Sequence, residues 1–92
     1  MYQILPYTFN QAKRMGVLIS PSEKPKYKID VYTKSGEFVS SVGASGYSDY
    51  PHYIEERGKE YADNRRRLYK IRHQKDRMVV GSRGWLSDNL LW

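Results

Sequence analysis

Residues 27–43 read YKIDVYTKSGEFVSSVG, and this stretch decides the fold class. Apolar and polar side chains alternate over 27–33, which is the pattern of a half-buried β-strand. The letters KSG at 34–36 supply a turn, and EFVSSVG at 37–43 returns as a second strand. Two strands joined by a short glycine-containing turn form a hairpin. The sequence therefore predicts a β-hairpin over 27–43.

The segment that follows the hairpin is helical in composition over residues 51–76. Pro51 suits the first turn of a helix, and Ser48 or Asp49 is placed to cap that turn. Gly58 is the weak point, because glycine costs about 1 kcal/mol in a helix interior. We therefore expect either one long helix or two helices divided at Gly58.

On a helical wheel this segment is apolar on one side and cationic on the other. The apolar stripe contains Ile54, Tyr61, Leu68 and Ile71. We predict that this stripe packs on the hairpin and is buried. The opposite stripe contains Arg66, Lys70, His73 and Arg77. We expect these cations to point outward and to be either a partner-binding face or merely a solvated surface.

The two ends of the chain give weaker signals. Residues 1–26 are poorly defined: MYQIL at 1–5 suggests a short strand, 15–19 is a second apolar run, and a proline-containing loop follows. Residues 82–92 form an aromatic C-terminal segment, for which we expect a short helix. Its LLW ending is either a plug of the core or a docking surface. The aromatic and apolar candidates for partner contact are Tyr47, Tyr50, Trp85, Leu90, Leu91 and Trp92.

These signals together predict an α+β fold. A small β-hairpin sheet is followed by a long basic helix and a short C-terminal helix. The chain has 92 residues, so we expect one small domain spanning 1–92. A domain of this size buries roughly 60 to 65% of its unfolded surface, which leaves little room for a deep cleft.

Charge and composition bound the function. The formal net charge is +6, and residues 57–77 alone hold nine Lys/Arg against three acids. An excess of this kind implies an acidic partner, either nucleic acid or an acidic protein surface. There is no cysteine, which excludes disulfides and thiolate chemistry and fits a reducing compartment. No apolar run approaches a membrane span, and the N-terminus lacks the pattern of a secretory leader.

Catalytic and metal-binding motifs are missing. His52 and His73 are the two histidines, and three or four converging ligands are needed to hold a metal. Asp49 and His52 could together act as a general base, in which the carboxylate orients the imidazole. No partnered nucleophile and no phosphate-binding glycine loop accompanies them. We therefore predict a protein that is not an enzyme and that has no metal, no cofactor and no small-molecule substrate.

Arg65, Arg66 and Arg67 are three successive cations, and at least one of them must face the packed side of a helix. Arg65 and Arg72 lie seven residues apart and flank the apolar stripe. We expect a structural role for these two, with the guanidinium groups stacked on tyrosine or paired with an acid.

Three spaced motifs resemble a known group of sequences. They are GYSDYP at 46–51, RGKEYADNRRRLYKIRHQKDR at 57–77 and GSRGWLSDNLLW at 81–92. Together they resemble small uncharacterised proteins of tailed phages and nucleocytoplasmic large DNA viruses, over about residues 43–92. The resemblance implies a viral origin and no particular activity. The matching residues are Gly46, Tyr47, Asp49, Tyr50, Arg66, Tyr69, Arg72, His73, Leu90, Leu91 and Trp92. We interpret four of them as a structural signature of the fold, and we add Arg65 to this set. The four are Gly46, Asp49, Tyr69 and Arg72.

The resulting functional hypothesis is a small, non-enzymatic virion component, such as a minor capsid or assembly-interface protein. Its expected partners are larger viral structural proteins with acidic or apolar surfaces, in the virion or in the cytoplasm of the infected cell. The alternative is a viral DNA- or RNA-binding protein that uses the basic helix face. No membrane partner is expected.

Overall fold

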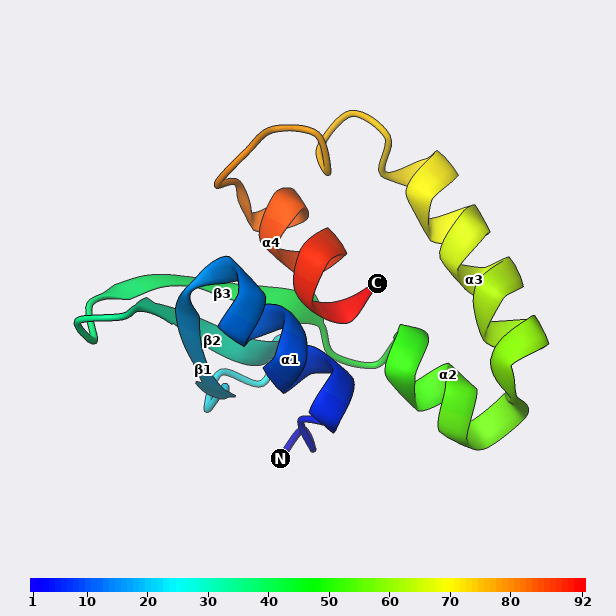
Figure 1. Cartoon of the computed structure of the whole chain (residues 1–92), viewed down its shortest axis with the longest axis horizontal. Coiled ribbons are helices and arrows are strands. Elements are labelled where there is room, and N and C mark those ends of the chain that lie inside the picture. Colours follow the sequence, from blue (N-terminus) through cyan, green and yellow to red (C-terminus); the bar gives the residue numbers. More distant parts are fainter. The chain divides into compact units, whose positions relative to one another are not determined.

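The computed structural model describes all 92 residues and has the α+β class, with a three-stranded antiparallel sheet and four helices (Figure 1). Residues 1–46 and residues 47–92 form two compact units. The first unit contains one helix and the sheet, and the second contains three helices. No helix is long and apolar enough to cross a membrane.

The first unit opens with helix α1 (Pro6–Met15), which leads into strand β1 (Val17–Pro21). Pro6 is at the first helical position, where its missing N–H costs nothing. Gly16 ends the helix with a φ of 73°, a left-handed conformation that glycine adopts without strain. The expectation of a short strand at residues 1–5 is wrong, because the strand of this region is β1.

The sheet has the order β1-β2-β3, and both strand pairs are antiparallel. Strand β2 (Tyr27–Thr33) and strand β3 (Phe38–Ala44) are joined by the predicted turn, so the hairpin is confirmed. β1 adds a third strand on the other side of β2, which the sequence did not predict. One face of the sheet is core, since Ile29, Val31 and Val42 are each 0% exposed.

The second unit contains α2 (Tyr50–Arg57), α3 (Lys59–Arg72) and α4 (Arg83–Leu91). Asp49, one of the two predicted capping residues, caps α2 by accepting a hydrogen bond from the backbone N–H of His52. Gly58 divides α2 from α3 and has a φ of 89°, so the two-helix alternative is the observed one. The long helix expected over 51–76 therefore becomes two shorter ones.

The C-terminal helix is confirmed as α4 and begins after Ser82. The Ser82 hydroxyl accepts a hydrogen bond from the backbone N–H of Trp85, which satisfies one of the free donors of the first turn. Leu90 and Leu91, at the end of α4, are both 0% exposed. The end of the C-terminal segment is thus buried.

The predicted rotation of the basic helix is wrong. Leu68 is 37% exposed and Ile71 is 62% exposed, whereas Ala62 and Tyr69 on the other side of α3 are buried. Tyr69 stacks on Trp92, with ring centroids 4.3 Å apart. The helix therefore packs through a small residue, a tyrosine and the stems of its cations, since long cationic side chains can cover apolar surface while their heads find polar partners.

Candidate partner-binding surface

Arg66 is turned toward the interior of its unit and not toward solvent. Its Nε donates a hydrogen bond of 2.7 Å to the main-chain oxygen of Trp92. Its guanidinium carbon lies 3.4 Å from the ring centroid of Tyr50, which is a close cation–π contact. These two contacts join α3 to α2 and to the end of α4.

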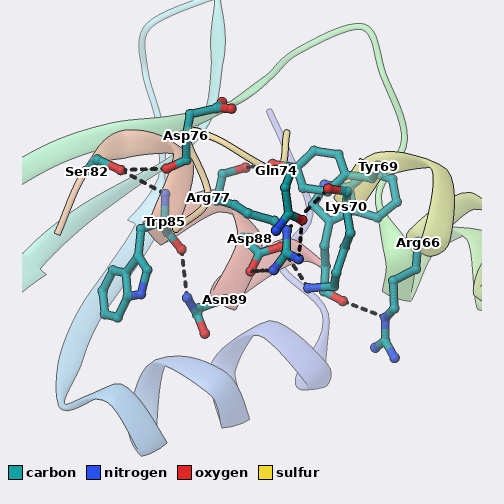
Figure 2. Close-up of polar contacts among 12 residues, drawn as sticks. Arg66, Tyr69, Lys70, Gln74, Asp76, Arg77, Ser82, Trp85, Asp88 and Asn89 are labelled. Carbon is teal, nitrogen blue, oxygen red and sulfur yellow. Dashed lines mark hydrogen bonds and ion pairs between the residues drawn. The ribbon is translucent and has the colours of Figure 1, made fainter. Parts of the chain in front are cut away.

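Lys70 and Arg77 converge on Asp88 of α4 (Figure 2). The Lys70 Nζ is 2.7 Å from Asp88 Oδ1, and the Arg77 Nη1 is 3.9 Å from Asp88 Oδ2. Arg77 also donates to the main-chain oxygen of Lys70 and to the side-chain oxygen of Gln74. The Asp88 side chain is only 9% exposed, so the ion pair with Lys70 is partly screened from water.

His73 completes a stack of three rings. Its ring lies 4.3 Å from the ring of Tyr69, which in turn stacks on Trp92. The His73 Nδ1 is 3.0 Å from Asp76 Oδ2, and this hydrogen bond lowers the pKa of the Asp76 carboxyl. The four cationic-stripe residues thus make contacts inside residues 47–92, and the prediction that they point outward is wrong.

The aromatic and apolar candidates divide into buried and exposed groups. Leu90, Leu91, Tyr50 and Trp92 are buried, which favours the core-plug interpretation of the LLW ending. Trp85 is half-buried, and Tyr47 is 76% exposed. Of this set, Tyr47 is therefore the side chain most open to a partner.

The expected structural role of Arg65 is confirmed, because its guanidinium lies 5.4 Å from the ring centroid of Tyr53. Arg72 is exposed at the end of α3, and its structural role stays a prediction.

The side of α3 that faces away from Ala62 and Tyr69 is exposed. It contains Leu68 and Ile71, which we predicted to be buried. We call it the α3 outer surface, and it consists of Arg67, Leu68, Ile71 and Arg72. Positions three and four apart share a helix face, so the two aliphatic side chains lie between two guanidinium groups. Residues 78–80, Met-Val-Val, are also exposed, each by more than half. In the sequence, apolar residues that stand among several charged ones are the signal that could have indicated this surface.

The structure offers no metal-binding constellation, since no three His, Cys, Asp or Glu side chains are grouped to hold an ion. Asp49 and His52 do meet, with 2.7 Å between Asp49 Oδ1 and His52 Nδ1. The same carboxylate caps α2 and is fully buried. The pair therefore has a structural task at the start of α2.

Two tyrosines carry a testable pH dependence. Burial raises the pKa of Tyr50, as does the hydrogen bond of 2.7 Å that its hydroxyl donates to Asp63. Burial likewise raises the pKa of Tyr69. The folded state therefore holds both phenol protons more tightly than the unfolded state, whose tyrosines titrate near pH 10. This stabilisation is present below that pH and is lost as the pH rises through the folded pKa.

In an alkaline titration followed by tyrosinate absorbance, we expect Tyr50 and Tyr69 to ionise at a higher pH than free tyrosine, together with loss of helical signal. Tyr50→Phe and Tyr69→Phe should each remove one late group. Ionisation of all tyrosines in one step, with the fold intact, would contradict the assignment.

Comparison with protein-family models, curated proteins and solved structures finds no match to this chain. Any assignment of function to this chain therefore depends on its fold and on the surfaces described above. The resemblance to the viral group stays a prediction.

Proposed function

We propose that this chain is a non-enzymatic binding protein, a small virion component that docks on a larger viral protein through the α3 outer surface. The observation that supports the proposal is the exposure of Leu68 and Ile71 between Arg67 and Arg72. Contiguous exposed apolar patches bordered by polar residues are typical of interaction sites. An apolar centre with arginine beside it is typical of protein interfaces.

Charge defines the partner. The α3 outer surface has two guanidinium groups, and exposed Lys75 follows in the next turn, whereas Glu60 is an exposed acid near the start of the same helix. The complementary surface is therefore an acidic protein patch with an apolar centre. Nucleic acid fits this face less well, because aliphatic side chains give a base no ring to stack on. The cations Arg66 and Lys70 of the nucleic-acid alternative are already held by Trp92 and Asp88.

The test is incorporation into particles of the virus that encodes the chain. Mass spectrometry of purified particles should find the wild-type protein, and the double variant Arg67→Glu/Arg72→Glu should be at least about tenfold depleted, since both contacts become like-charge repulsions. Leu68→Ser/Ile71→Ser should be depleted as well. Circular dichroism must show that both variants are folded.

The matched control is Lys13→Glu/Lys26→Glu, which makes the same charge change at two exposed positions of residues 1–46. It should enter particles normally. Equal occupancy of the wild type and the α3 variants, or absence of the wild type from particles, would overturn the proposal.

A further inference from the structure

A second exposed surface lies on the sheet. Leu18, Tyr32 and Phe38 are direct cross-strand partners, one from each strand, and we call them the aromatic row. Directly opposed residues project from the same face of a sheet. Leu18 is 50% exposed and Phe38 is 53% exposed, while Tyr32 is half-buried. The row therefore presents two rings and an aliphatic side chain to solvent.

The aromatic row is not the core of the sheet. Alternation along β2 places Ile29 and Val31 on one face and Asp30 and Tyr32 on the other, and the first two are 0% exposed. The rings of Tyr32 and Phe38 meet edge to face with centroids 5.8 Å apart. This contact orients the two rings and still leaves half of Phe38 uncovered. A pair of contacting rings that includes a half-exposed phenylalanine is therefore a feature that core packing does not require.

A cation lies beside the exposed ring. The Lys24 Nζ is 4.8 Å from the ring centroid of Phe38 and donates to Ser41 Oγ at 3.1 Å. Ser41 in turn donates to Asp30 Oδ1 at 2.6 Å, so this carboxylate is engaged within the sheet. Lys24 itself is exposed. Its ammonium group is thus held next to the ring while remaining open to an anion.

The net charge of this unit is positive, although its three acids lie close to the aromatic row in sequence or on the same face of the sheet. Residues 1–46 contain six Lys/Arg and three acids, which gives a net charge of +3. The acids are Glu23, Asp30 and Glu37. Exposed rings, an adjacent ammonium and a positive unit are the combination that proteins use to bind single strands, in which bases stack on aromatic side chains and cations follow the phosphates.

We propose that the aromatic row and Lys24 bind single-stranded nucleic acid, with a base stacked against Phe38 and Tyr32 and a phosphate paired with Lys24. Such binding is tolerant of sequence, because every base offers a π-face. A duplex hides those faces in its own stack, so the site discriminates against double strands. This surface consists of Leu18, Lys24, Tyr32 and Phe38 and shares no residue with the α3 outer surface, so either proposal can fail without the other.

Fluorescence anisotropy of the full chain with labelled oligo(dT), oligo(U) and a duplex of the same length tests the proposal. We expect both single strands to bind more tightly than the duplex, and to weaken as salt rises. Phe38→Ala should weaken single-strand affinity about tenfold, within the range that loss of one stacked base produces. Phe38→Tyr keeps the ring and should retain affinity. Lys24→Ala should reduce the salt dependence.

The matched control is Phe9→Ala, because Phe9 is an equally exposed phenylalanine (51%) of the same unit, located on α1. It should leave the affinity unchanged. No binding of either single strand by the wild type would overturn the proposal. Equal losses from Phe38→Ala and Phe9→Ala, or a duplex bound as tightly as the single strands, would also overturn it.

Discussion

Replacing Leu90 by alanine is expected to lower the free energy of unfolding by about 2–5 kcal/mol. Leu90 is 0% exposed and lies near the end of α4, where a shortened side chain leaves a cavity that the neighbouring residues cannot fill. This is a large part of the stability of a domain of this size. Chemical denaturation followed by circular dichroism measures the loss.

Leu68→Ala is the matched control, since the same atoms are removed from an exposed position of α3. We expect a change of about 0.5 kcal/mol or less, the usual size for surface substitutions. If Leu68→Ala costs as much as Leu90→Ala, then α3 packs through the stripe that the wheel predicted, and the observed rotation of the helix is wrong.

The double variant Arg66→Glu/Lys70→Glu is expected to lower the free energy of unfolding by at least about 2 kcal/mol, because hydrogen bonds to charged groups contribute about 1.5–3 kcal/mol each. The change at Arg66 removes the hydrogen bond to Trp92 and the contact with the Tyr50 ring. The change at Lys70 places a carboxylate against Asp88, its present partner at 2.7 Å. Denaturant unfolding of the variant and the wild type checks this value.

Arg67→Glu/Arg72→Glu changes the charge by the same amount on the exposed side of the same helix. Its free energy of unfolding should stay within about 1 kcal/mol of the wild type, since two surface substitutions contribute about 0.5 kcal/mol each. Equal stability of the two double variants would show that the contacts of Arg66 and Lys70 do not hold α3 in place. The two double variants thus distinguish the cations of α3 that stabilise the fold from those that we propose to bind a partner.

Local chemistry made several features predictable. Alternating side chains around a glycine-containing turn specified β2 and β3. A capping residue at 48 or 49 followed by Pro51 indicated the start of α2, and Gly58 marked a possible break that the structure shows between α2 and α3. Each of these features depends on neighbours within a few residues, so sequence patterns contain the information.

Residues 1–26 were harder to interpret for a physical reason. Leu5, the residue before α1, makes no side-chain cap hydrogen bond, so the usual signal of a helix start is missing. β1 is five residues long and pairs with β2, whose own sequence does not show on which side it has a second partner. A short edge strand is stabilised by that pairing and not by its own composition.

By itself, the sequence determined the α+β class, the hairpin and the C-terminal helix. It narrowed the cap of α2 to Ser48 or Asp49, and it marked Gly58 as the place where a long helix could divide. Tertiary structure decided which side of α3 faces inward. The partners of its cations, Asp88 and the main-chain oxygen of Trp92, lie 18 and 26 residues from Lys70 and Arg66 along the chain. A helical wheel ranks side chains by hydrophobicity and does not include distant acceptors. These acceptors pair with the charged groups of Arg66 and Lys70, so the aliphatic stems of the two side chains can be buried. The aliphatic side chains of Leu68 and Ile71 are then left at the surface.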